Sequence, residues 1–277
     1  MPIPHQASHD RQPVVAGQFY PGEPQALMEE VRGHLAGAKP KNAARTILAM
    51  APHAGYVFSG AVAGATLGQA NLAPTVLLLG PNHTGLGKPF AVWPDGRWLF
   101  PGGALAVDEE LAALLLAADA RLKPDTLAHQ REHSLEVMLP FLAALTPETK
   151  IVPVCIAQPG LDTLQAVGLA VGRVLRDLGR PASVLISSDM SHYVPHDTAR
   201  RQDSRALEPV LRLDVPAFYE TVRGEGISMC GVLPMTVGLT AALELGAARA
   251  EIAAYATSGQ VNGDTRRVVG YAGLLVS

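Results

Sequence analysis

Short apolar runs recur along the chain, and most are followed by a loop and then by a helical pattern. Residues 46–51, 75–79, 150–156 and 183–186 form four such runs, in which apolar residues do not alternate with polar ones. Strands that are buried on both faces of a mainly parallel sheet have this appearance, because neither face of the sheet contacts water. These runs therefore predict parallel strands, and the apolar stretch at 267–276 predicts one more strand.

Helical patterns alternate with these runs. They cover residues 59–70, 108–118, 161–178, a stretch that starts at about 197, and 229–245. Asp108 is the predicted N-cap of the second helix, and two glutamates in its first turn complement the helix dipole. Pro234 lies close to the start of the last helix, where proline is tolerated. The alternation predicts an α/β fold, with a mainly parallel or mixed central sheet and helices on both faces.

One edge of the sheet is predicted to be mixed. Residues 90–107 contain short strands, and the turn signal WPDGRW at 93–98 suggests a hairpin there. Residues 1–10 are predicted to be a flexible N-terminus, and residues 11–277 are predicted to form a single domain.

Composition excludes several classes of protein. The 277 residues are 48% hydrophobic and 17% charged, which rules out disorder, collagen and coiled coil as global descriptions. A net charge of −3, scattered basic residues and 5% aromatic residues argue against nucleic-acid binding. No apolar stretch approaches the roughly 18 residues of a membrane span, and the N-terminus lacks the apolar core of a signal peptide. With only two cysteines, the expected location is the cytoplasm.

Three histidines follow the ends of predicted strands. His53 comes two residues after the first apolar run, His83 four residues after the second, and His192 six residues after the fourth. Ligands of open α/β sheets bind at the loops that follow the carboxyl ends of the strands, because these loops converge at one edge. A single loop histidine usually makes only a local hydrogen bond. Three histidines in equivalent places predict a shared metal or catalytic pocket.

The two cysteines differ in their surroundings. Cys155 lies inside an apolar run, where a free cysteine usually acts as a small hydrophobic side chain. Cys230 lies at the start of the predicted helix 229–245, and a helix N-terminus favours a thiolate. From position alone, ordinary burial and a role as nucleophile or metal ligand both stay open for Cys230.

The segment HQREHSLE at 129–136 matches the H-x-x-E-H pattern of inverted zinc peptidases, which need both histidines on one continuous helix. Pro124 and Pro140 make a long helix through the segment doubtful, which disfavours a peptidase. The other interpretation puts His133 at a helix start, where a lowered pKa leaves a neutral imidazole that acts as a base or hydrogen-bond donor.

The loop SSDMSH contains Ser188, Asp189 and His192. Residues this close together on one loop rarely form the line of nucleophile, base and orienting carboxylate that a hydrolase needs. A hydrolase triad is therefore disfavoured. Asp189 is instead expected to hold a histidine ring from behind.

Several motifs occur in a fixed order along the chain: VAGQFYP at 15–21, PHAGYVFSG at 52–60, GPNHTG at 80–85, EHSLEVMLPFL at 132–142, SSDMSHY at 187–193, SMCG at 228–231 and NGDTRRVVGYAGLLV at 262–276. With these motifs the chain resembles the Memo (mediator of cell motility) family, whose prokaryotic members are called AmmeMemoRadiSam system protein B. The resemblance runs from about residue 11 to the end. It implies a fold similar to that of class III extradiol dioxygenases.

The resemblance also implies a site. It places a metal on His53, His83 and Cys230, with Asp189 and His192 beside them and His133 lining the pocket. His133, His192 and Asp189 would then be the catalytic residues. Extradiol dioxygenases hold iron(II) with two histidines and a carboxylate. A thiolate in place of the carboxylate is softer and shifts the preference towards copper(I) or zinc, so ring cleavage is not implied.

Two functions follow as hypotheses from the resemblance. The first is a metal-dependent redox or oxygenase-like enzyme, with iron(II) as the expected metal and copper or zinc as alternatives. The second is a non-catalytic module that binds a peptide or carries a metal in a dioxygenase-like pocket. The family name further implies an Amme-type protein and a radical SAM protein as partners in one modification system. The substrate is not implied.

Overall fold

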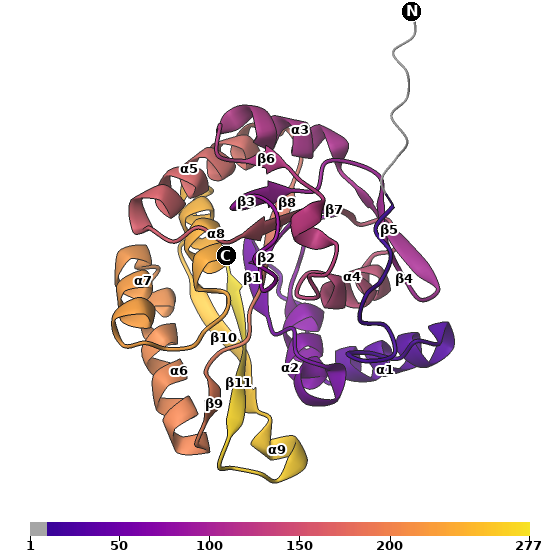
Figure 1. Cartoon of the computed structure of the whole chain (residues 1–277), viewed down its shortest axis with the longest axis vertical. Coiled ribbons are helices and arrows are strands. Elements are labelled where there is room, and N and C mark those ends of the chain that lie inside the picture. The colour runs from indigo at the N-terminus through magenta and orange to yellow at the C-terminus, as the bar shows by residue number, and fades with distance from the viewer. Residues whose placement is uncertain (1–9) are drawn as a thin grey trace, which may run out of the picture.

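One mixed sheet runs through the molecule, and helices cover both of its faces (Figure 1). The computed structural model describes residues 10–277. The predicted flexible segment 1–10 therefore lies outside the described residues except for Asp10, whose carboxylate accepts a hydrogen bond of 2.6 Å from Arg97 Nη2.

The strands include all five that the apolar runs predict. They are β1 (Leu48–Ala51), β2 (Thr75–Pro81), β3 (Phe90–Val92), β4 (Arg97–Phe100), β5 (Gly103–Val107), β6 (Lys123–Pro124), β7 (Lys150–Ile156), β8 (Ala182–Ser187), β9 (His192–Val194), β10 (Ala250–Thr257) and β11 (Val268–Val276). The main path of the sheet has the order β10-β11-β1-β8-β2-β7-β3-β6. Within it, β1, β8, β2 and β7 are parallel neighbours, and every residue of β1 and β2 is buried. The prediction of an α/β fold with a mixed sheet is confirmed.

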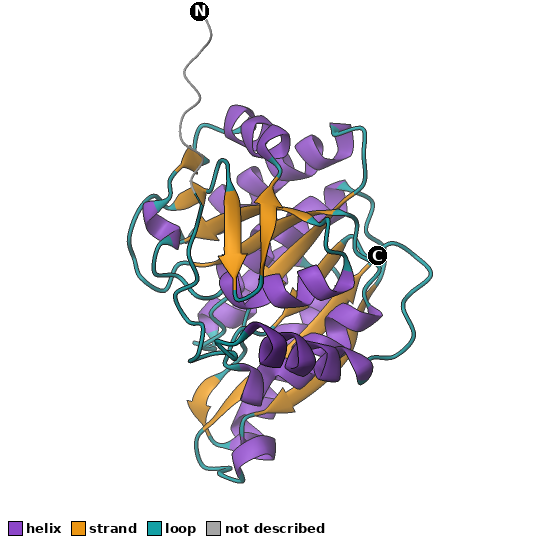
Figure 2. Ribbon diagram, turned by 90° about the vertical axis from the view of Figure 1, so that its right-hand side faces the viewer, coloured by secondary structure: helices purple, strands orange, loops and turns teal. Residues whose placement is uncertain are grey.

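The helices form two layers around this sheet. They are α1 (Pro24–Ala36), α2 (Tyr56–Gln69), α3 (Glu109–Ala118), α4 (Leu139–Leu145), α5 (Leu161–Asp177), α6 (His196–Leu211), α7 (Val215–Gly224), α8 (Val232–Glu244) and α9 (Gly259–Asn262), with two 3-10 turns, η1 (Leu127–His129) and η2 (Glu136–Met138). Helices α1, α2 and α4 pack together on one face, and α3, α5, α6, α7 and α8 cover the other (Figure 1). The view turned by 90° shows the strands of the sheet with helices around them (Figure 2). Among the described residues, the helices lack the combined length and apolarity that crossing a membrane requires.

The predicted hairpin lies elsewhere than the turn signal suggests. The loop around Gly96 does turn the chain, with a positive φ of 77° at this glycine, but the strands on either side of it do not pair. The completely buried β3 instead extends the central sheet beyond β7, antiparallel to it. The hairpin is formed by β4 and β5, which are joined at Pro101–Gly102. The prediction of a hairpin turn at 93–98 was therefore wrong, because the burial of β3 against β7 determines its pairing.

The predicted N-cap at Asp108 is confirmed, and the structure adds a second role for it. Its side chain accepts from the backbone amide of Leu111, and both of its oxygens lie 2.8 Å from Arg180 Nη2. Burial raises the pKa of Asp108, but the hydrogen bonds from Arg180 and Leu111 outweigh burial, so the pKa lies below its ordinary value. This carboxylate joins the start of α3 to the end of α5.

We expect Asp108→Asn to lower the free energy of unfolding by about 1–3 kcal/mol at pH 7, because charge-assisted hydrogen bonds are lost. A carboxyl group whose pKa is lowered on folding stabilises above its unfolded pKa, here near 3.8, and this stabilisation is lost as the pH falls through the folded value. Urea unfolding at pH 7 and pH 3 should therefore show a difference that shrinks in acid. Asp177→Asn, at a 70% exposed side chain, is the control. An equal difference at both pH values would contradict the role of the charge.

Candidate metal centre

Three neighbouring parallel strands bring the site together. His53 follows β1, His83 follows β2, and the loop 188–191 follows β8, which lies between these two strands. Ala51 pairs with Ser187 in register, so β1 and β8 end at the same level. The structure thus places His53 and His83 at the carboxyl edge of the sheet, as the strand-end pattern predicts.

His133 joins these two histidines. Ring nitrogens of His53, His83 and His133 all lie within 4.8 Å of one another, close enough to bind a single metal ion. The ring centroids are 5.3 Å apart for His53 and His83, and 5.0 Å apart for His83 and His133, whose planes are stacked. The Sγ atom of Cys230 lies 3.2 Å from His53 Nε2. Three imidazoles and one thiol therefore form the candidate metal centre.

Hydrogen bonds fix the ring of His53. Ser187 Oγ donates to the carbonyl oxygen of Ser134 at 2.5 Å, so its lone pair accepts from His53 Nδ1 at 2.7 Å. This assignment leaves Nε2 of His53 unprotonated and facing Cys230. Asp189 also holds His53, through a 2.8 Å hydrogen bond from the backbone amide of His53 to Oδ1. Asp189 was expected to hold a histidine ring, and in the structure its carboxylate holds the main chain of His53.

Glu132 lies behind the other two histidines. This fully buried carboxylate accepts from the His83 backbone amide at 2.6 Å and contacts His83 Nδ1 at 2.9 Å. His133 Nδ1 is 3.6 Å from the same carboxylate. The sequence reasoning missed Glu132 as a site residue, although the EHSLE motif contains it. A carboxylate on Nδ1 leaves Nε2 free for a metal and fixes the orientation of the ring.

Burial and charge set the protonation of the cluster. Burial lowers the pKa of His53 well below its ordinary value, and it also lowers the pKa of His133. Burial opposes protonation of His83 too, but the hydrogen bond and the charge of Glu132 outweigh it and raise the pKa. Glu132 itself has a pKa of about 2, because bonds from His83 and from the Ser134 amide outweigh its burial. His53 and His133 are therefore neutral and have lone pairs available for a metal.

Cys230 approaches the cluster through a glycine. It lies two residues before α8, and a Cβ on the next residue, Gly231, would come 2.3 Å from the Cβ of Ser188. Only a glycine permits this approach of α8 to the loop after β8. The Asp189 amide donates to the sulfur at 3.2 Å. Burial nevertheless raises the pKa of Cys230, and the charge of Asp189 adds to this effect, so burial outweighs the preference for a thiolate that a helix start brings.

The alternative uses of these segments are excluded by geometry. His129 ends the 3-10 turn η1, whereas His133 lies in the loop before η2, so the two histidines do not share a helix as an inverted zinc peptidase requires. His129 is buried, with Nε2 3.0 Å from the Ala91 carbonyl oxygen and Nδ1 3.4 Å from Cys155 Sγ. Cys155 is fully buried, as predicted. His133 also does not begin an α-helix, because α4 starts only at Leu139, and its lowered pKa comes first from burial.

His192 lies farther out on the loop after β8. Its Nδ1 is 2.9 Å from the Ser228 carbonyl oxygen, and Ser188 Oγ donates to the Asp189 carbonyl oxygen at 2.8 Å. Ser188 and His192 thus use their polar atoms on separate backbone partners, and the prediction against a hydrolase triad is confirmed. His192 still lowers the pKa of His53 through its charge, and it is only partly buried.

One side of the centre is open to solvent. The side chain of His83 is 36% exposed and that of His133 is 24% exposed, whereas His53 is buried. A ligand from solution therefore reaches the cluster from the side of His83 and His133.

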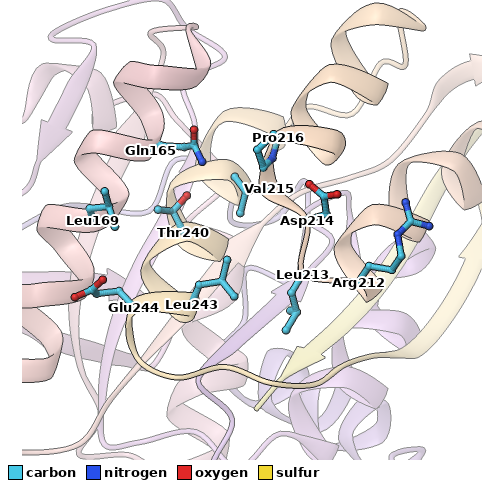
Figure 3. A pocket seen from close by; sticks show the side chains of 10 residues that line it. All are labelled: Gln165, Leu169, Arg212, Leu213, Asp214, Val215, Pro216, Thr240, Leu243 and Glu244. Carbon is cyan, nitrogen blue, oxygen red and sulfur yellow. The ribbon is translucent and has the colours of Figure 1, made fainter.

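A cavity of about 700 Å³ lies elsewhere, between α5, α8 and the turn from α6 to α7 (Figure 3). Its charged groups already have partners: Arg212 pairs with Glu208, Glu244 pairs with Arg176, and Asp214 caps α7. This cavity offers no group of convergent donors, so the histidine cluster is the candidate functional site.

Comparisons with known proteins find relatives over nearly the whole chain. A family profile described as "Memo-like protein" matches residues 11–275. A MEMO1 family protein of Methanopyrus kandleri is 41% identical, and one of Methanosarcina barkeri is also 41% identical; the matches cover 96% of this chain and 98% and 99% of these relatives. A MEMO1 family protein of Aquifex aeolicus is 38% identical over the same share of the chain and 98% of its own length.

We predict that Glu132→Gln lowers the pKa of His83, because the amide removes the negative charge that stabilises the protonated imidazole. A pH titration of the histidine Cε1 protons by NMR, on metal-free protein, measures this directly. Glu148→Gln, at an exposed position, serves as the matched control. The same change should weaken metal binding about 10–100-fold. An unchanged pKa of His83 would show that Glu132 does not govern this ring.

Proposed function

Because the chain belongs to the Memo family and carries a cluster of metal-ligand side chains, we propose that it is a metal-dependent redox enzyme of the oxygenase type with iron(II) as its metal. The observation that carries this proposal is the convergence of His53, His83 and His133 at the carboxyl edge of the sheet. Their ring nitrogens lie within 4.8 Å of one another, and the side chains of His83 and His133 are accessible to solvent.

The donor set fits a transition metal. Imidazole nitrogens suit iron, copper, zinc and nickel, and neutral imidazoles bind without first losing a proton. His53 and His133 have lowered pKa values, and the Nδ1 atoms of His53 and His83 are held by Ser187 and Glu132. Bound iron(II) would supply electrons for redox chemistry and open positions for a substrate.

The residues of this chain then divide into holding and proton-handling groups. We assign His53, His83 and His133 as nitrogen donors and Cys230 as the sulfur donor beside His53. We assign proton exchange with a substrate to His192, which is partly exposed. Asp189 keeps the backbone of His53 and the sulfur of Cys230 in place through its carboxylate and its amide. The substrate class stays open, and so do the predicted Amme-type and radical SAM partners.

One observation favours a second function. If Cys230 binds together with the three histidines, the protein supplies four donors, and four protein ligands are typical of closed sites that hold a metal without catalysis. A thiolate also favours copper(I) or zinc over iron(II). The second candidate is therefore a module that carries such a metal. Six-coordinate iron(II) with these four donors keeps open positions, whereas four-coordinate zinc with the same donors has none. The identity of the metal and its open positions therefore distinguish the two functions.

We expect protein purified without oxygen and without an affinity tag to contain close to one iron per chain by mass spectrometry. His53→Ala and Cys230→Ala should each lose most of this metal, because each removes a donor from the cluster. His196→Ala changes a histidine outside the cluster, which binds Thr257, and should keep the metal. Oxygen consumption by the iron-loaded protein would support the enzyme. Copper or zinc in place of iron, without oxygen consumption, would support the carrier. Absence of metal in the wild type would refute both.

A further inference from the structure

The guanidinium of Arg11 is buried next to the loop that carries His133. This residue is only 3% exposed, and its charged group lies 4.3 Å from the centre of the Trp98 ring. Its donors reach three acceptors on one stretch of chain: the His129 carbonyl oxygen at 2.9 Å, the Glu132 carbonyl oxygen at 2.5 Å and Glu136 Oε2 at 2.7 Å. Arg11 thus binds the segment 129–136 at its beginning, middle and end.

Glu136 completes this connection from the other side. Its fully buried carboxylate accepts from the backbone amides of Val14 and Val15 at 2.9–3.0 Å and from the Tyr20 hydroxyl at 2.6 Å. Segments 11–20 and 129–136 are therefore joined by one buried ion pair and the hydrogen bonds that surround it. This ion pair between Arg11 and Glu136 is not among the contacts of the metal centre described above.

The connection ends on His133. Two of the groups that Arg11 binds, at Glu132 and Glu136, lie on either side of His133 in the chain. The ring of Phe19, in the segment 11–20, lies 4.7 Å from the ring of His133. The carbonyl oxygen of Phe19 accepts from the amide of Tyr56, which begins α2 three residues after His53. The position of His133 is therefore fixed by the contacts of Arg11 with Glu132 and Glu136 and by the ring of Phe19.

A buried ion pair is weak evidence for stability, because desolvation of both charges offsets their attraction. The geometry of this pair points to a different role. A planar guanidinium reaches several acceptors in fixed directions, which a lysine ammonium does not do. Two of the three acceptors here are main-chain carbonyl groups, so the guanidinium determines where the backbone of residues 129–132 lies.

We propose that Arg11 is a positioning residue of the metal centre, which holds the 129–136 loop so that His133 faces His53 and His83. The expected effect of Arg11 on metal affinity rests on the proposed metal site, because misplacement of one donor weakens metal binding. The position of His133 against Phe19 belongs to the metal-free protein and is measured separately.

Two variants remove the guanidinium without leaving a buried charge unpaired. Arg11→Lys keeps a positive charge beside Glu136 but loses the fork to the two carbonyl groups. Arg11→Met combined with Glu136→Gln removes both charges, while the glutamine oxygen still accepts from the amides of Val14 and Val15. Arg97→Lys, at a side chain that is 59% exposed and pairs with Asp10, is the matched control.

The test measures the nuclear Overhauser effect between the rings of Phe19 and His133 in metal-free protein, and Co²⁺ affinity from its visible absorption. We expect both Arg11 variants to unfold cooperatively, to lose the ring contact and to bind Co²⁺ about tenfold more weakly, whereas Arg97→Lys behaves like the wild type. A merely structural role predicts that the double variant, once the charges are removed, regains the wild-type contact.

The ring contact decides the proposal. If the contact between Phe19 and His133 persists in the double variant or in Arg11→Lys, the guanidinium does not position His133 and the proposal is overturned. Co²⁺ affinity decides the other question. A wild-type protein that binds no Co²⁺ at all contradicts the proposed metal site. The effect of Arg11 on the ring contact is then still decided by the NMR measurement.

Discussion

The parallel pairing of β8 with β1 on one side and with β2 on the other is the interaction on which the histidine cluster depends. Ala51 pairs with Ser187, and Leu79 pairs with Ile186, so the three strands end almost level. A shift of one residue in either pairing would reverse the faces of every side chain on the shifted strand. The complete burial of all three strands opposes such a shift, because side chains of different size would then meet in closely packed layers on both faces.

The second determinant is a negative charge where water is excluded. The ionised Glu132 lies behind His83 and His133, and its lone pairs are occupied by backbone amides and by the ring of His83. The cluster itself gathers neutral groups, because burial disfavours charge on His53, His133 and Cys230. A metal that binds Cys230 as a thiolate must displace its proton, and the raised pKa of His83 means that a proton competes with the metal for that ring as well. Its affinity therefore rises with pH, as for other sites built from thiols and imidazoles.

The sequence was sufficient for the features that depend on periodicity. The apolar runs predict β1, β2, β7, β8 and β11, since full burial leaves a continuous apolar signal. Helix α5 is predicted to within one residue at its end. The sequence does not predict β10, because this edge strand is half-buried and lacks such a run. The hairpin was misplaced because turn residues report the local bend, whereas strand pairing depends on contacts with β7.

The candidate site was predictable to a similar degree. Strand ends alone predict a pocket shared by His53, His83 and His192, whereas the structure places His133 with the first two. The position of Cys230 left its role open, and only the family resemblance suggested it as a ligand, because its approach depends on the packing of α8 against the loop after β8. Glu132 and Arg11 were missed for a common reason. Each acts through partners about fifty or more than a hundred residues away in the chain, and no local spacing records these contacts.

The position of β1 in the sheet also has a consequence for how the molecule forms. Its two neighbours are β8 and β11, and Leu48 pairs with both Val184 and Val276. Residues 52–181 lie between β1 and β8, and residues 52–267 lie between β1 and β11, so both edges of β1 depend on segments that are distant in the chain. Contacts this distant make folding slow, and an unpaired apolar strand is a template for association with other chains. During synthesis β1 therefore leaves the ribosome well before β8 and β11 do, and its two edges stay unpaired during that interval.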